Sequence, residues 1–172
     1  SARETAVRVA AGAVCRQLLA ACGVEVKSGV LSVGPVSLEE PREGFSFATL
    51  AKVDDASPFR AVDPALEEKM TQAVDAAAKK GDTLGGTILL AARGVPPGLG
   101  SHVSWDRKLD GRIGQAMLSI PSVKAVSIGS GVSNAFAPGS LAHDPISWSE
   151  ERGFFRERNR AGGLEGGITN GE

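Results

Sequence analysis

Three times along the chain, a helical spacing of apolar residues is followed by a short apolar run of strand length. Helices are expected over residues 3–22, 63–80 and 106–120, and residues 37–60 lose the periodicity and predict a long loop. Alternating helices and strands of this kind pack as layers around a core. The pattern predicts a mixed α+β fold of helix–strand repeats, and the length suits a single domain over residues 1–172.

The expected strands differ in how much of their surface should be buried. Residues 24–33 alternate apolar and polar side chains, with a bulge expected at Gly29. Residues 88–92 form an uninterrupted apolar run, which predicts a buried strand. Further strands are expected over residues 123–128 and 154–155.

The closing segment, residues 159–172, places glycines in pairs around a Leu-Glu step. Because glycine costs backbone entropy, such clustering indicates either a disordered tail or a chain that bends through positive φ against a ligand. Arg156, Arg158 and Arg160 alternate along the predicted strand before it, so they are expected to share one face. Three cations on one face favour an anionic ligand, a phosphate or a carboxylate, near Gly162.

Composition and spacing argue against several classes of function. A net charge of −1 and 5% aromatic residues with no tyrosine do not favour a nucleic-acid partner, and no apolar run approaches a membrane span. Neither a Gly-x-Gly-x-x-Gly turn nor a phosphate-binding Gly-Lys-Ser/Thr loop is present. His102 and His143 lack neighbouring ligands, so we expect no metal site and assign both to hydrogen bonding within loops.

Two cysteines and the first residues bear on the compartment and origin of the chain. Cys15 and Cys22 lie on one face of the first predicted helix, too far apart to bond each other, and are expected to be buried free thiols in a reducing cytosol. The chain lacks an initiator Met and a signal peptide, and Ser1 with Glu4 matches a capping box. We therefore expect a processed protein or a fragment of a longer one.

Several short motifs follow one another along nearly the whole chain. They are Ser1-Ala-Arg-Glu-Thr5 with Val9-Ala-Ala-Gly12, Gly81-Asp-Thr-Leu-Gly-Gly86, Gly94-Val-Pro-Pro-Gly-Leu-Gly100, Lys108-Leu-Asp110, Met117-Leu-Ser-Ile120 and Asn159-Arg-Ala-Gly-Gly-Leu-Glu-Gly-Gly-Ile-Thr-Asn-Gly171. This ordered set resembles the chorismate synthase family, and the closing motif is its most specific part. The resemblance covers the central part of that family.

The resemblance implies the last common step of aromatic amino-acid biosynthesis, in the shikimate pathway. There, 5-enolpyruvylshikimate 3-phosphate loses phosphate and a proton by 1,4-anti elimination to give chorismate. The resemblance also implies a requirement for reduced FMN, although the reaction has no net redox change. NADPH is one candidate reductant of the flavin. The resemblance implies a cytoplasmic homotetramer with no nucleic-acid or membrane partner, whose helices lie between sheets in a β-α-β sandwich.

Carried over residue by residue, the resemblance implies one substrate contact and four cofactor contacts. Arg3 is expected to bind the substrate, and Ser1, Pro121, Ser122 and Gly167 are expected to contact FMN. The Pro121-Ser122 pair is more often Gln-Ala or Asn-Ala in the family, so its contact would depend on the backbone. Ala125, Val132 and Arg158 stand where the family usually has Gly, Phe and Ser or Thr.

No catalytic residue is expected within this stretch. The family's two catalytic histidines and its Arg-Ser-Asp flavin motif belong to segments outside it, and His102 and His143 do not match them. We predict that the isolated chain is inactive, because acid–base catalysis needs its proton donors within reach. The alternatives are a non-catalytic module that binds a flavin or phosphate, and a purely structural or assembly domain.

Overall fold

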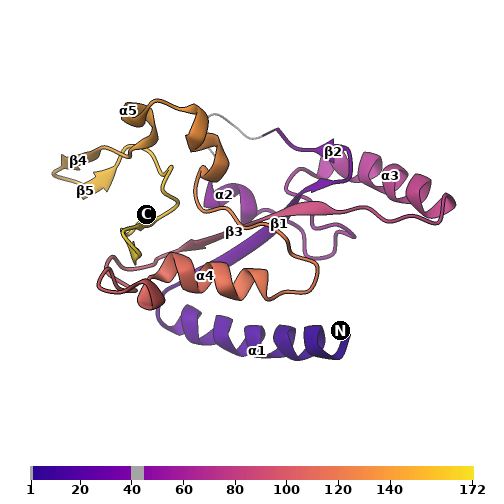
Figure 1. Cartoon of the computed structure of the whole chain (residues 1–172), viewed down its shortest axis with the longest axis horizontal. Coiled ribbons are helices and arrows are strands. Elements are labelled where there is room, and N and C mark those ends of the chain that lie inside the picture. Colours follow the sequence, from indigo (N-terminus) through magenta and orange to yellow (C-terminus); the bar gives the residue numbers. More distant parts are fainter. Residues whose placement is uncertain (1, 40–44) are drawn as a thin grey trace. The chain divides into compact units, whose positions relative to one another are not determined.

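The computed structural model of the chain describes residues 2–39 and 45–172, and Figure 1 shows the course of its helices and strands. The chain divides into two compact units, Glu25–Arg93 and the flanking segments Ser1–Val24 with Gly94–Glu172. Helices and small sheets occur in both units, in agreement with the predicted mixed α+β class. The expectation of a single domain stays a prediction.

The middle unit, Glu25–Arg93, is built on a three-stranded antiparallel sheet in the order β2-β1-β3. Its strands are β1 (Glu25–Val33), β2 (Val36–Ser37) and β3 (Gly86–Arg93). The pairing of β1 with β3 shifts register between Val30 and Ser32. The sequence predicted a bulge at Gly29. The irregularity instead lies after that glycine, between Val30 and Ser32.

One edge of β1 pairs with the segment around Ala61. The N–H of Val30 donates to the carbonyl of Arg60, and the N–H of Val62 donates to the carbonyl of Val30, both at 2.9 Å. A Cβ atom at Gly29 would lie only 2.7 Å from Val62 Cγ2. Close packing against this segment therefore accounts for glycine at position 29.

Helices of very different length complete the middle unit. They are α2 (Phe47–Leu50), the 3₁₀ turn η1 (Pro64–Leu66) and α3 (Glu67–Lys79). α2 lies inside the predicted long loop, where Ser46 caps its first turn. The helix expected over residues 63–80 is confirmed, with Asp63 as its cap. Leu50 and Met70 are fully buried and anchor α2 and α3 in the core.

β3 is a strand, as its sequence predicts, but the prediction that it is buried is wrong. Ile88 is 72% exposed and Leu90 is 52% exposed. An uninterrupted apolar run identifies a strand, whereas burial depends on which element packs against it. Within the described residues no element covers these two side chains.

The flanking unit begins with α1 (Ala2–Ala21), which confirms the helix expected over residues 3–22. No residue of α1 is buried, and Leu18 is 67% exposed. Cys15 and Cys22 are both exposed free thiols, so the prediction of buried thiols is wrong. The helical spacing gave the correct element, but Val7, Val14 and Leu18 of its apolar face are exposed.

The remainder of this unit consists of short elements. They are η2 (Trp105–Arg107), α4 (Leu109–Leu118), η3 (Gly131–Phe136), α5 (Gly139–Ala142), β4 (Ile146–Ser149), β5 (Gly153–Arg156), β6 (Leu164–Glu165) and β7 (Ile168–Thr169). β4 pairs with β5 and β6 with β7, each antiparallel. The predicted third helix is confirmed and consists of η2 followed by α4. The strand predicted at residues 154–155 is confirmed as β5. The strand predicted over residues 123–128 is wrong, because this stretch has no regular secondary structure and pairs with no strand among the described residues.

Candidate functional site

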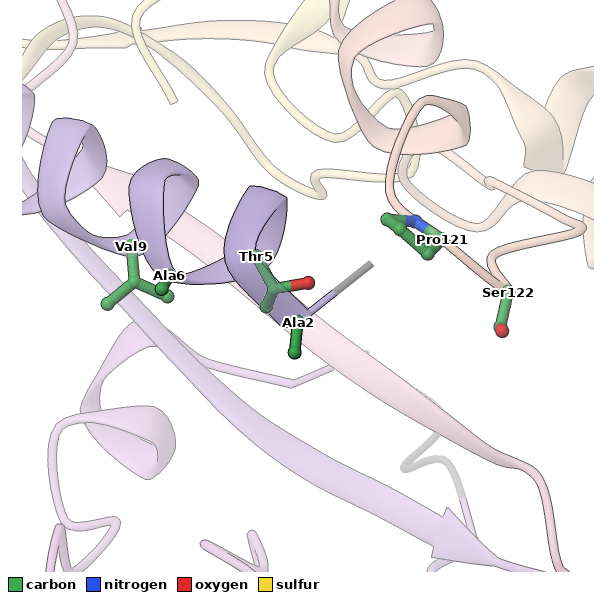
Figure 2. A pocket seen from close by; sticks show the side chains of 6 residues that line it. All are labelled: Ala2, Thr5, Ala6, Val9, Pro121 and Ser122. Carbon is green, nitrogen blue, oxygen red and sulfur yellow. The ribbon is translucent and has the colours of Figure 1, made fainter.

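A pocket lies where the first turns of α1 meet the segment that follows α4 (Figure 2). It is lined by Ala2, Thr5, Ala6 and Val9 from α1 and by Pro121 and Ser122 from the opposite segment. Its volume is about 720 Å³, and much of it is open to solvent. The lining is mostly apolar and adds two hydroxyl groups, which suits a flat ligand with an apolar body and polar edges.

Pro121 and Ser122 are the central residues of a tight turn after α4. The N–H of Val123 donates to the carbonyl of Ile120 at 3.2 Å, and Ser122 has a φ of +71°. Proline followed by a residue with positive φ is the pattern of a type II turn, which favours glycine or asparagine at the second of these positions. Serine in this left-handed conformation costs about 1–2 kcal/mol. One wall of the pocket is therefore a strained turn.

The structure brings Pro121 and Ser122, two of the predicted flavin contacts, to the helix that carries Arg3. Arg3 is exposed in the first turn of α1, where backbone N–H groups also favour an anion. Arg3 is not a lining residue of the pocket, although Ala2 beside it is. Ser1 lies outside the described residues, so the capping box and the flavin contact assigned to it stay predictions.

Gly167 lies elsewhere in the flanking unit, in the turn between β6 and β7. Gly166 and Gly167 have φ values of +63° and +90°, as the two central residues of a type I′ turn require. The carbonyl of Gly167 accepts from the N–H groups of Ser101 (3.3 Å) and Leu109 (2.8 Å), and a Cβ would lie 2.5 Å from Lys108 Cγ. Packing thus accounts for this glycine, and its contact with flavin stays a prediction.

The glycine-rich closing segment is folded, so the expectation of a disordered tail is wrong. Gly98 donates its N–H to the carbonyl of Thr169 at 2.8 Å, and the Thr169 hydroxyl donates to the carbonyl of Pro96 at 2.6 Å. Asn159 accepts the N–H of Gly163 at 2.7 Å. The chain does bend repeatedly through positive φ, as the alternative interpretation predicted. It bends against the loop that contains Pro96 and Gly98.

The three arginines before this segment do not form one cationic face. β5 ends at Arg156, whose guanidinium pairs with the carboxylate of Glu165. Arg158 donates to a backbone carbonyl, and the backbone N–H of Arg160 donates to the carboxylate of Asp144 at 2.9 Å. The prediction of a shared face is wrong because the strand stops after its first arginine. Of the three cations, Arg156 is paired with a carboxylate, and the anion expected near Gly162 stays a prediction.

Among the described residues, the histidines and the other titratable side chains do not gather into a metal site. His143 offers its backbone carbonyl to Arg158 Nη2 at 2.9 Å, and His102 lies in the loop before η2. Over residues 2–39 and 45–172, no three His, Cys, Asp or Glu side chains come together as metal ligands would. No helix in the same part of the chain is long and apolar enough to cross a bilayer.

Comparison with known proteins identifies the group to which this chain is related. The family model described as chorismate synthase matches residues 1–172. The chorismate synthase of Symbiobacterium thermophilum is 53% identical over 171 residues, covering 99% of this chain and 44% of the relative. That of a strain of Thermus thermophilus is 53% identical over 172 residues, covering 100% of this chain and 44% of the relative. The chain therefore spans less than half the length of these relatives.

Comparison with solved structures agrees with the comparison of sequences. A crystal structure of a chorismate synthase matches with a TM-score of 0.93 and 45% sequence identity. The match covers 99% of this chain and 53% of the solved one, which confirms the predicted fold class. The chain belongs to the chorismate synthase family.

Proposed function

We propose that this chain supplies part of the active site of a chorismate synthase, a lyase of aromatic amino-acid biosynthesis. The observation that carries the proposal is the match of the entire chain, at about half identity, to enzymes of that name. The pocket at the start of α1 supports it, because residues assigned to the flavin from sequence line it. The substrate would be 5-enolpyruvylshikimate 3-phosphate and the products chorismate and inorganic phosphate.

The reaction breaks one C–O bond to phosphate and one C–H bond, and forms a double bond in the ring. Its substrate carries a phosphate and carboxylates, so binding needs cations that form charge-assisted hydrogen bonds. Arg3 offers such a cation, exposed at the positive end of a helix of 20 residues. Its proposed role is to bind and orient the anionic substrate.

The pocket fits the apolar ring system of a flavin with polar edges. Ala2, Ala6 and Pro121 offer apolar surface, and Ser122 offers a hydroxyl group. When bound, reduced FMN would supply reducing equivalents that are recovered in each turnover, because the reaction has no net redox change. The residues of this chain would exclude water from the ring and fix its position.

The wider properties of the enzyme form part of the same proposal. We propose a cytoplasmic homotetramer and, as in the resemblance above, NADPH as a candidate reductant of the flavin. The proton donors would come from the part of the family's length that this chain does not span. The 172 residues alone would therefore give no turnover.

A chimera tests the proposal directly. Residues 1–172 replace the matching segment of the Thermus thermophilus relative, which is 53% identical, and chorismate formation is measured with reduced FMN. We expect a turnover within about tenfold of the relative's own, which corresponds to about 1.4 kcal/mol in activation free energy. A chimera with native circular dichroism that forms no chorismate would contradict the proposal.

Two variants of the chimera test the role of Arg3. Arg3→Ala should lower kcat/KM about tenfold or more, since a hydrogen bond to a charged group is lost. Arg107→Ala removes the same charge from an exposed position on η2 and should leave kcat/KM within about twofold. Equal effects of the two variants would mean that Arg3 contributes only net charge.

A further inference from the structure

Arg8 connects the two walls of the pocket. Its Nη1 donates to Ser119 Oγ at 2.9 Å, and its Nη2 donates to the carbonyl of Ser119 at 3.1 Å. Ser119 caps the C-terminus of α4 and lies two residues before Pro121. We propose that Arg8 is a positioning residue, which holds the turn of Pro121 and Ser122 against α1 at the separation that a bound ligand requires.

Hydrogen bonds to Glu4 and to Ser119 fix the orientation of the Arg8 guanidinium. Nε and Nη2 of Arg8 donate to Glu4 Oε1 at 3.1 and 2.9 Å, one helical turn earlier. The Ser119 hydroxyl donates its proton to the carbonyl of Ala116 at 2.6 Å, so its oxygen is free to accept from Arg8. The planar guanidinium can make these contacts together, whereas a lysine ammonium cannot match the same geometry.

This connection matters because the turn is strained. A left-handed serine persists only where the surrounding structure over-determines it, and such strain gathers at ligand-binding sites. The side chains of Glu4 and Arg8 are 59% and 40% exposed, and exposed ion pairs contribute little to overall stability. The contacts of Arg8 therefore serve local geometry more than global stability.

The inference rests on the proposed function for the identity of the ligand, FMN, but not for the geometry. Three variants of this chain isolate the geometry. Arg8→Ala removes all its contacts, Ser119→Ala removes the hydroxyl without a change of charge, and Arg8→Lys keeps the charge. Arg112→Ala, at an exposed position on α4, is the control for loss of a positive charge.

The first measurement is the Kd of FMN, by titration of flavin fluorescence. We expect Arg8→Ala to weaken binding about tenfold, Ser119→Ala several-fold and Arg8→Lys to an intermediate degree, with Arg112→Ala unchanged. If only the loss of charge weakens binding, so that Ser119→Ala and Arg8→Lys bind like the parent, Arg8 attracts the anion and the positioning role is overturned.

The second measurement needs no ligand. Backbone amide signals of Ile120, Ser122 and Val123 are compared by NMR between the parent chain and Arg8→Ala, with circular dichroism as the check on folding. Shifted or broadened signals confined to this turn support positioning, even if the parent chain does not bind FMN, a result that would count against the proposed flavin site alone. Unchanged turn signals in Arg8→Ala would overturn the inference.

Discussion

Thr169 and Leu99 hydrogen-bond to each other twice, across 70 residues of sequence. The N–H of Thr169 donates to the carbonyl of Leu99, and the N–H of Leu99 donates to the Thr169 hydroxyl, both at 2.9 Å. The same hydroxyl donates to the carbonyl of Pro96, and Thr169 is buried. One side chain thus attaches the glycine-rich segment to the loop between Gly94 and Ser101.

Replacing Thr169 with valine should destabilise the chain by about 1–3 kcal/mol, because two backbone groups lose their buried partner. Urea unfolding followed by circular dichroism gives the free energy. Thr169→Ser keeps the hydroxyl and should lose clearly less. Equal losses for serine and valine would show that the methyl group, and not the hydroxyl, is important.

Gly167 and Gly166 form a matched pair for testing the turn between β6 and β7. Alanine at either position is strained by about 1–2 kcal/mol, because both have positive φ. At Gly166 the added Cβ meets nothing within 4 Å, whereas at Gly167 it meets Lys108 and the carbonyl of Ser101. Gly167→Ala should therefore lower the unfolding free energy by at least about 1 kcal/mol more than Gly166→Ala. Equal midpoints in urea would contradict the close packing of Gly167 against Lys108.

Substitution of Asp144 tests a second set of hydrogen bonds, which hold the start of the glycine-rich segment. Its two carboxylate oxygens accept the N–H groups of Arg160 (2.9 Å) and Ala161 (2.8 Å), and it is buried. Asp144→Asn places an amide donor against one of these donors and should cost about 1–3 kcal/mol in unfolding free energy. Glu150→Gln loses the same charge at an exposed position and should change stability by less than about 0.5 kcal/mol.

Two glycines without positive φ should respond to alanine in opposite directions. Gly12 lies inside α1 with nothing within 4 Å of an added Cβ, so Gly12→Ala should stabilise by about 0.5–1 kcal/mol. Gly29→Ala should destabilise by about 1–3 kcal/mol, because its Cβ would overlap Val62 and Val53. Thermal unfolding of both variants reads out the signs, and a stabilising Gly29→Ala would refute the packing of β1.

Local signals predicted the helices well because their causes are local. Asp63 caps the second helix through its own side chain, and Gly23, with a φ of +80°, follows the end of α1. Burial depends on partners that no single segment specifies, which explains the errors at Cys15 and Ile88. The missed strand β4 carries an alternation, Ile146-Ser-Trp-Ser149, that a stricter test for period two could have found.

Only part of the candidate site could be predicted, because the sequence does not specify its long-range contacts. Pro121 and Ser122 were assigned from resemblance, and the structure places them against α1. Helical spacing pairs Glu4 with Arg8, but no rule of spacing links Arg8 to Ser119, 111 residues away. Long-range hydrogen bonds of this kind depend on the tertiary fold, and no local sequence pattern predicts them.

The division of the chain has a consequence for the order in which its parts form during synthesis. The unit Glu25–Arg93 is continuous, so its β1–β3 pairing can form as soon as that stretch has left the ribosome. The flanking unit is discontinuous, and its closure waits for Thr169 to reach Leu99. Until the segment after α4 has been translated, α1 lacks the hydrogen bonds of Arg8 with Ser119 that join it to the rest of its unit.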